Sequence, residues 1–324
     1  MADLVAMTGS RRGVALATVL ALATACGNDG VGPDPTVNEP PLPARTVFPA
    51  DNEWNRDISA DSVDADSDSL IASCGGSSSL HPDFGTVYQG APWGIPFVTV
   101  RGTQPRVGVT FDYADESDPG PYPVPRGSPI EGGSGSTGDR HVLVVDVDNW
   151  TLYELFDAHP ANGGASWTAG SGAVFDLSSN TLRPDGWTSA DAAGLPIFPG
   201  LARYDEVAGG LITHALRFTC PVSRRAYVFP ARHYASTRTG IHLPPMGMRV
   251  RLKAGVDISG FPADVQVILT ALRTYGMLLA DNGGAFFVSG APDPRWNDST
   301  INTMKRLSGS DFEVVKMRGL VVGP

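Results

Sequence analysis

The sequence lacks most of the short motifs by which enzymes are recognised. It contains no G-x-S-x-G elbow, no H-E-x-x-H, no paired C-x-x-C, no G-x-G-x-x-G after a strand and no Walker lysine. Ordinary esterase, zinc-peptidase and nucleotide-dependent chemistry are therefore unsupported. The 6 histidines are dispersed along the chain, so only the fold could bring them together on a metal. The sequence predicts neither a metal nor a cofactor.

Charged residues are also scarce, at 18% of the 324 residues, and acidic ones outnumber basic ones. The formal net charge of -10 argues against a nucleic-acid surface, because phosphate binding needs clustered positive charge. The 38 glycines and 27 prolines favour a turn-rich, mainly β (α+β) fold over a helical bundle. We expect one β-sandwich or distorted barrel with one long helix and one or two short ones.

The hydrophobic run near the N-terminus is too short to span a bilayer as a mature helix. Residues 13–25 are uncharged, follow an arginine pair and lead through small residues into Cys26. This pattern predicts a signal peptide over residues 1–25. Residues 22–26 resemble a bacterial lipobox, in which Cys26 is lipidated after cleavage; the alternative is an ordinary signal peptide with a chance cysteine. By lipobox sorting, Gly27 does not indicate inner-membrane retention, so we expect a lipid anchor in the outer membrane or at the cell surface.

The lipobox is followed by a polar, proline-rich segment. Residues 26–46 therefore read as a tether, and residues 47–324 as a single β-rich domain without internal repeats. Cys74 and Cys220 remain in an oxidising compartment, where they either form one disulfide or stay as separate buried thiols. Neither sits beside a histidine in an arrangement that would make it catalytic.

Aspartates at positions 64, 66 and 68 have the alternate spacing of a calcium loop. However, Ser69 stands where the glycine should be and Gly75 where the closing glutamate should be. We interpret this stretch as a solvated acidic cap on a short helix.

Residues 209–233 carry two histidines and four arginines through strand-forming sequence. Residues 211–218 and 226–230 are predicted to form a β-hairpin, because a turn sequence lies between them. A second hairpin is predicted from residues 140–146 and 151–156. Apolar residues at helical spacing predict one long helix over residues 262–275.

His214 lies on the apolar face of its predicted strand. One interpretation is a core histidine whose ring is satisfied by a backbone carbonyl or a carboxylate. The other is a general acid or base whose pKa is set by burial and by Asp205 or Glu206. Strand alternation puts Arg217 on the opposite face, so it shares a pocket with His214 only if a bulge intervenes.

Glycan hydrolysis needs two carboxyl groups, one protonated and one ionised, and the loops contain several. Acidic residues at loop or strand-end positions are Asp115, Glu116, Glu131, Asp191, Asp205, Glu206 and Asp281. Tryptophans in glycine- and proline-rich loops either stack on sugar rings or plug the edge of the core. The predicted catalytic residues are His214, Glu206, Asp205 and Asp191. The predicted substrate-binding residues are Arg217, Arg232, His233, Trp187 and Asp281.

Several segments resemble a group of secreted bacterial proteins of unassigned activity. They are residues 48–55, WTSADAAGLPIFPGLARYDEV at 187–207, HALRF, PARH, LPPMGMRVRLK, ADNG and PDPRW. The resemblance covers nearly all of residues 47–315. It implies export and a single domain, and it supplies no catalytic residues.

The sequence thus favours a monomeric carbohydrate-active hydrolase or lyase that acts outside the cytoplasm. Its partner would be a polysaccharide or another extracellular ligand, and its only membrane contact the lipid anchor. The alternatives are a non-catalytic glycan- or surface-binding lipoprotein and a structural envelope protein. A deep cleft with a perturbed carboxyl pair would favour the enzyme, and a shallow aromatic platform the binding protein.

Overall fold

The structure, a computed structural model, describes residues 39–323. The predicted signal peptide of residues 1–25 and the lipidation site at Cys26 lie outside the described residues. Strands account for 26% of the chain and helices for 17%, which confirms the mainly β class. No sheet formed by the described residues closes into a barrel.

The larger sheet has six strands in the order β1-β15-β11-β14-β13-β16. These are β1 (His81–Asp83), β15 (Phe287–Ser289), β11 (Leu216–Cys220), β14 (Met277–Asn282), β13 (Arg249–Leu252) and β16 (Phe312–Val314). The central strand β11 runs parallel to β14 and antiparallel to β15.

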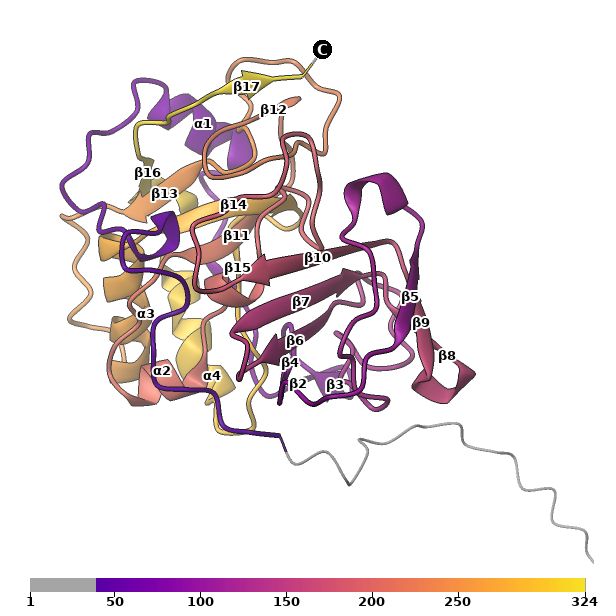
Figure 1. Cartoon of the computed structure of the whole chain (residues 1–324). Coiled ribbons are helices and arrows are strands. Elements are labelled where there is room, and N and C mark those ends of the chain that lie inside the picture. Colours follow the sequence, from indigo (N-terminus) through magenta and orange to yellow (C-terminus); the bar gives the residue numbers. More distant parts are fainter. Residues whose placement is uncertain (1–38, 324) are drawn as a thin grey trace, which may run out of the picture. The chain divides into compact units, whose positions relative to one another are not determined.

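A second sheet has four strands in the order β10-β7-β6-β4 (Figure 1). These are β10 (Ser171–Asp176), β7 (Thr151–Phe156), β6 (Val142–Asp146) and β4 (Phe97–Val100). Strands β6 and β7 pair antiparallel across a short turn, which confirms the second predicted hairpin.

Three smaller sheets complete the strand pairing. A three-stranded sheet is formed by β5 (Gly108–Phe111), β9 (Ser166–Ala169) and β8 (His159–Ala161). The two-stranded pairs are β2 (Val87–Tyr88) with β3 (Ala91–Pro92), and β12 (Ala226–Tyr227) with β17 (Val321–Val322).

The helices are short, with one exception. The α-helices are α1 (Ser67–Cys74), α2 (Tyr204–Ala208), α3 (Ala263–Thr274) and α4 (Asp298–Ile301). The 3-10 helices are η1 (Glu53–Asn55), η2 (Ala114–Glu116), η3 (Asn162–Gly164), η4 (Phe198–Gly200), η5 (Asn302–Arg306) and η6 (Gly309–Asp311). Within residues 39–323, none has the length and apolar character needed to cross a membrane.

Helix α3 confirms the long helix predicted from the sequence. Pro262 is its N-cap, and one face of the helix is buried against the core. The chain turns into β14 at Gly276, whose φ of 69° is in the left-handed region. A Cβ at this position would lie 2.3 Å from the Val250 carbonyl oxygen, so only glycine fits.

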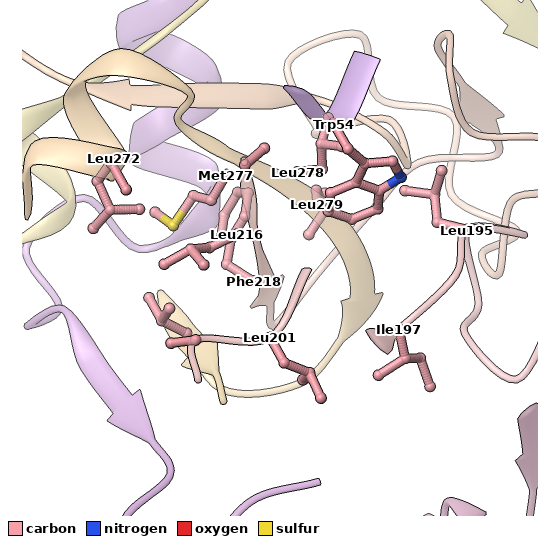
Figure 2. Close-up of a cluster of buried hydrophobic side chains, with 14 of the residues drawn as sticks. Trp54, Leu195, Ile197, Leu201, Leu216, Phe218, Leu272, Met277, Leu278 and Leu279 are labelled. Atoms are coloured by element: carbon pink, nitrogen blue, oxygen red, sulfur yellow. The ribbon is translucent and has the colours of Figure 1, made fainter. Parts of the chain in front are cut away.

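The two main sheets share one hydrophobic core. Leu216 and Phe218 from β11 and Met277 and Leu279 from β14 belong to it, and Leu195 and Ile197, from the segment that connects the sheets, lie at the other side of the cluster (Figure 2). Each side chain of this size contributes roughly 1.5–3 kcal/mol by leaving water. The opposite face of the four-stranded sheet packs against a second cluster that includes Tyr122 and Trp167.

The hairpin predicted over residues 211–230 is wrong. Strand β11 begins only at Leu216 and pairs with β14 and β15, whereas β12 pairs with β17 near the C-terminus. The turn between β11 and β12 reverses the chain without joining the two strands. Pairing with distant strands buries β11 on both sides, which a local hairpin could not do.

The tether predicted over residues 26–46 ends earlier than expected. Pro40 is buried, and its carbonyl oxygen accepts a hydrogen bond of 2.5 Å from the Thr99 hydroxyl. Leu42 packs against the core, and the Arg45 guanidinium lies 3.7 Å from the centre of the Trp150 ring. Residues 39–46 are therefore part of the folded domain rather than of a free linker.

A disulfide joins Cys74, at the end of α1, to Cys220, at the end of β11. Both residues are fully buried, and their Cα atoms lie 5.1 Å apart. The bond closes a loop between residues 146 positions apart in the sequence. It therefore ties the early helix to the central strand of the larger sheet.

Removing the disulfide is expected to lower the free energy of unfolding. A loop of this length gives a loss of roughly 2–5 kcal/mol, because the open chain gains conformational entropy when it unfolds. Urea denaturation of the Cys74→Ala/Cys220→Ala variant measures the loss. Wild type in reductant should match the variant, and the variant should not respond to reductant. Equal midpoints for oxidised wild type and the variant would contradict the expectation.

Candidate active site

A cavity of about 240 Å³ opens where strand ends of the two main sheets meet. Asp281 comes from the end of β14, Asp139 precedes β6, and Asp191 lies on the loop between the sheets. The residues that line it are Tyr113, Asp139, Phe156, Ser171, Thr188, Ser189, Ala190, Asp191, Ala192, His233, Ala235, Asp281 and Asn282. Three acids and one histidine thus share a single small opening.

A bulge in β14 places Asp281 at this opening. Phe218 pairs with Leu279 but Thr219 pairs with Asp281, so Ala280 is an extra residue in β14. The insertion shifts the alternation by one position and brings Asp281 to the face that carries Arg217. The extra residue is also fixed from outside the sheet, because its carbonyl oxygen accepts a hydrogen bond of 2.9 Å from the Ala193 N–H.

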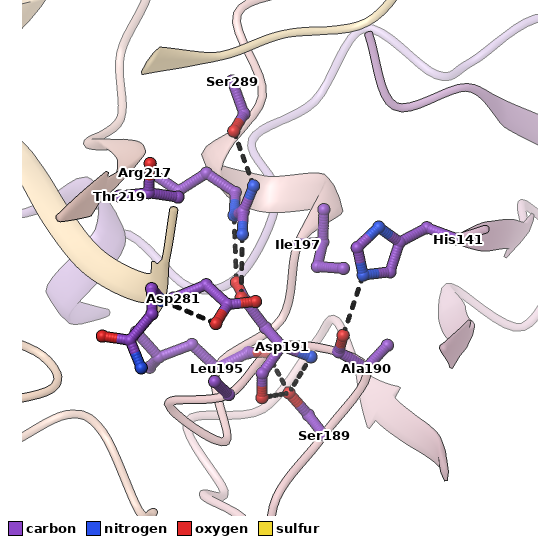
Figure 3. A network of polar contacts seen from close by, with 12 residues as sticks. His141, Ser189, Ala190, Asp191, Leu195, Ile197, Arg217, Thr219, Asp281 and Ser289 are labelled. Carbon is purple, nitrogen blue, oxygen red and sulfur yellow. Dashed lines mark hydrogen bonds and ion pairs between the residues drawn. The ribbon is translucent and has the colours of Figure 1, made fainter. Parts of the chain in front are cut away.

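Arg217 and Asp191 form a buried ion pair beside Asp281 (Figure 3). The guanidinium donates to both Asp191 oxygens, at 2.9 and 2.8 Å, and to the Ser289 hydroxyl at 2.5 Å. Burial raises the pKa of Asp191, and Arg217 opposes this shift. Because both carboxylate oxygens accept hydrogen bonds from the guanidinium, this geometry requires Asp191 to be ionised.

The loop that carries Asp191 is held in place by hydroxyl groups. The Ser189 hydroxyl oxygen lies 2.6 Å from the Leu195 carbonyl oxygen, to which it donates, and 2.9 Å from the Asp191 carbonyl oxygen, and it accepts from the Asp191 N–H at 2.9 Å. The Ser171 hydroxyl donates to the Ser189 carbonyl oxygen at 2.6 Å. The loop is thereby tied to the first residue of β10.

His141 supplies a second positive charge near the cavity. Its Nδ1 lies 2.6 Å from a Glu131 carboxylate oxygen and its Nε2 lies 3.0 Å from the Ala190 carbonyl oxygen (Figure 3). Both partners are acceptors, so both ring nitrogens must carry protons. Burial disfavours the charged ring, but Glu131 outweighs it and raises the pKa of His141 to about 9.

Carboxyl groups outnumber cations in this region. Glu154 is fully buried and accepts hydrogen bonds of 2.9 Å from the N–H groups of Ile197 and Phe198. Burial raises its pKa to about 7, despite those donors. Arg217 and His141 balance Asp191 and Glu131, so Glu154 and Asp281 are left without a cation of their own.

Asp281 is the unbalanced carboxyl group that faces the cavity. Burial, followed by the nearby charge of Asp191, raises its pKa to about 7. It is therefore partly protonated at neutral pH, as a proton donor must be. Asp139 lines the same cavity and is exposed to solvent.

His233 lines the cavity and has one ring nitrogen without a hydrogen-bond partner among the described residues. Its Nδ1 lies 2.7 Å from the Ala192 carbonyl oxygen, which fixes a proton on that nitrogen. Its Nε2 lies 3.8 Å from a Glu116 carboxylate oxygen. This distance is too long for a direct hydrogen bond, so Nε2 is open to a ligand or to water.

Glu131, Asp139 and His141 offer atoms that all lie within 4.8 Å of one another. This spacing would suit a metal ion, but the donor set does not. Both His141 nitrogens are protonated and bound to acceptors, so the ring has no lone pair to offer. His141 and Glu131 are better described as an ion pair with Asp139 nearby.

The structure brings His214 and Glu206 together, but at another place. His214 Nε2 lies 3.2 Å from both Glu206 oxygens, and its Nδ1 donates to the Ala215 carbonyl oxygen at 2.8 Å. Arg203 also contacts Glu206. The ring is buried with both nitrogens engaged, which matches the interpretation of a satisfied core histidine.

The remaining predicted residues lie outside the Asp281 cavity. Asp205 is exposed on α2 and forms an ion pair of 2.8 Å with Arg295. Arg232 forms an ion pair of 2.7 Å with Asp185. Trp187 is half-buried, with its ring 5.6 Å from the Arg183 guanidinium. Of the predicted residues, Asp191, Asp281 and His233 line the cavity. Arg217 does not line it, but it holds Asp191 through two hydrogen bonds.

Sequence reasoning missed Asp139 and underrated His141. The available signal was the run Asp139-Arg140-His141, three charged or titratable residues that directly precede a strongly apolar strand. Polar residues at such a strand end are candidates for a site, because strand ends meet at the edge of a sheet.

No family model, no curated protein and no solved structure matches the chain. The chemistry of the site therefore carries the functional inference alone.

The charge on His141 is expected to make stability depend on pH. A folded-state pKa of about 9, above the unfolded value of 6.5, stabilises the fold below pH 6.5. This stabilisation, about 3 kcal/mol, is lost as pH rises through 9. Urea midpoints of wild type should therefore fall between pH 7 and 9.5, and those of His141→Gln should change much less.

His159 provides the matched control, because it is exposed and pairs only with Asp157. The His159→Gln variant should keep the pH profile of wild type. Parallel profiles for wild type and His141→Gln would show that His141 is not charged in the folded protein.

Proposed function

We propose that this protein is a carbohydrate-active hydrolase that cleaves a polysaccharide outside the cytoplasm. The observation that carries the proposal is the shared cavity of Asp281, Asp139 and His233, with the half-buried Asp281 near the charged Asp191. Such a cavity has a proton donor, an exposed carboxylate and a histidine within reach of one small ligand group. These are the groups that acid–base cleavage of a glycosidic bond requires.

Asp281 is the proposed general acid. Cleavage of a glycosidic bond needs a proton on the leaving oxygen, and the pKa of about 7 lets Asp281 hold that proton near neutral pH. Asp139 is the proposed second carboxylate, which activates water or stabilises positive charge on the sugar. His233, through its open Nε2, would bind a sugar hydroxyl or assist the proton transfer.

Asp191 is proposed as a positioning residue. Its carboxylate is held on Arg217 by two hydrogen bonds, and its charge raises the pKa of Asp281. This moves the catalytic role away from His214, Glu206 and Asp205, which the sequence favoured. Their side chains take part in ion pairs and hydrogen bonds elsewhere.

The proposed location follows from the N-terminal sequence. A signal peptide and a lipidated Cys26 would anchor the protein to the bacterial cell envelope, and residues 27–38 would separate the anchor from the folded domain. A polysaccharide of the cell wall or of the surroundings is then within reach. A monomer suffices for this role, because one chain supplies every residue of the cavity.

The direct test is release of reducing ends from a panel of cell-wall and plant polysaccharides by the mature protein. We expect Asp281→Asn and Asp139→Asn to lower kcat by roughly 10²–10⁴-fold, the contribution of a positioned acid or base. The rate should fall as pH rises through about 7, because Asp281 then loses its proton.

Asp148→Asn is the matched control. Asp148 is exposed at the turn between β6 and β7, where it pairs with Arg101, so its variant should keep full activity. Loss of activity in Glu206→Gln with full activity in Asp281→Asn would return the active site to His214. Glycan binding without turnover on any polysaccharide would instead favour a non-catalytic binding lipoprotein.

A further inference from the structure

We infer that a second cavity, beside the one that holds Asp281, is a subsite for further sugar rings of a neutral glycan. This inference rests on the proposed function and names the substrate class. The second cavity has a volume of about 420 Å³ and lies between the β2–β3 hairpin, with the Trp93 that follows it, and the glycine-rich loop of residues 132–138. We call it the aromatic groove.

One wall of the aromatic groove is formed by Trp93 and Tyr88. Their ring centres are 5.8 Å apart, with the planes inclined by 36°. The Trp93 Nε1 donates to an Asp83 carboxylate oxygen at 3.1 Å, which fixes the indole in place. Tyr88 is 59% exposed, so its ring is accessible to a ligand. Ring faces of this kind stack against the apolar face of a sugar.

The opposite wall is a backbone loop that is itself held in place. The buried Arg140 donates from Nη1 to the carbonyl oxygens of Ser134 and Ser136, at 3.0 and 2.8 Å. Gly132 and Gly133 have φ of 70° and 84°, in the left-handed region that glycine tolerates best. The loop therefore offers backbone groups and the hydroxyl groups of Ser136 and Thr137 to the hydroxyls of a sugar.

The two cavities approach each other at Glu131 and Asp139. Glu131 lines the aromatic groove, whereas Asp139 lines the cavity that holds Asp281. A carboxylate oxygen of one lies within 4.8 Å of a carboxylate oxygen of the other. The inferred glycan would therefore extend from Tyr88 and Trp93 past Glu131 and Asp139 to Asp281.

The charge of the aromatic groove selects for a neutral ligand. Its charged lining residues are Asp83 and Glu131, and no lysine or arginine is among the residues that line it. Glu131 is paired with His141, whereas Asp83 has no ion-pair partner among the described residues. Phosphate, sulfated sugars and uronic acids would therefore meet the negative charge of Asp83 without a lining cation to bind them. The mixture of aromatic rings, hydroxyls and backbone groups suits an uncharged, hydroxyl-rich chain.

The test compares Tyr88→Ala with Val87→Ala. Val87 is on the same hairpin and equally exposed, at 59%, but it does not line the groove. Affinity for hexasaccharides of glucose, xylose, mannose and galactose is measured by calorimetry, in an Asp281→Asn background that prevents turnover. For each hexasaccharide that binds, we expect Tyr88→Ala to weaken affinity about tenfold. Val87→Ala should have no effect, and oligogalacturonate should not bind.

The outcomes separate this inference from the proposed function. Hydrolysis by wild type, together with equal affinities in the two hairpin variants, would overturn the subsite and leave the enzyme. Binding that depends on Tyr88, without hydrolysis by wild type, would support the subsite and refute the enzyme. Tighter binding of oligogalacturonate than of every neutral hexasaccharide, or no binding of any neutral hexasaccharide, would overturn the inference.

Discussion

A charge inside a protein core is stable only when an opposite charge or a set of hydrogen bonds compensates it. In this protein that requirement falls on Arg217, a buried residue of the central strand β11. Its partner Asp191 must therefore come from the connecting loop, at 2.8 and 2.9 Å. The same loop delivers the N–H groups of Ile197 and Phe198 to Glu154. One loop thus supplies both the partner of Arg217 and the donors to Glu154, and so links the two main sheets.

The excess of carboxyl groups around this pair gives the site its chemistry. Burial raises the pKa of Glu154 and Asp281 to about 7. Neither has an ion-pair partner of its own among the described residues, because Arg217 and His141 are paired with Asp191 and Glu131. Glu154 is sealed in the core, whereas Asp281 faces the cavity. A proton held at neutral pH on an accessible acid is a costly arrangement for stability, and enzymes use it for proton transfer. The balance of buried charges thus links the fold to the proposed function.

The sequence predicted the elements that depend on interactions between residues close together in the chain. Periodicity and capping identified α3, and alternation with a short turn identified the β6–β7 hairpin. The pairing of β11 with β14 and β15 could not be predicted, because these strands are distant from β11 in the chain. The sequence that follows β11 also resembles the turn of a hairpin. The site was partly predictable: Asp191, Asp281 and Arg217 were named. Their grouping depends on the bulge at Ala280, which no local sequence pattern predicts.

The protonation of Asp281 is the central claim, and NMR titration of its carboxyl carbon tests it most directly. The account predicts a midpoint near pH 7 in wild type. In Asp191→Asn the midpoint should fall, because the neighbouring negative charge is removed and Arg217 is left to favour the ionised form of Asp281. A wild-type midpoint at the ordinary aspartate value of about 3.9, unchanged in the variant, would contradict the account.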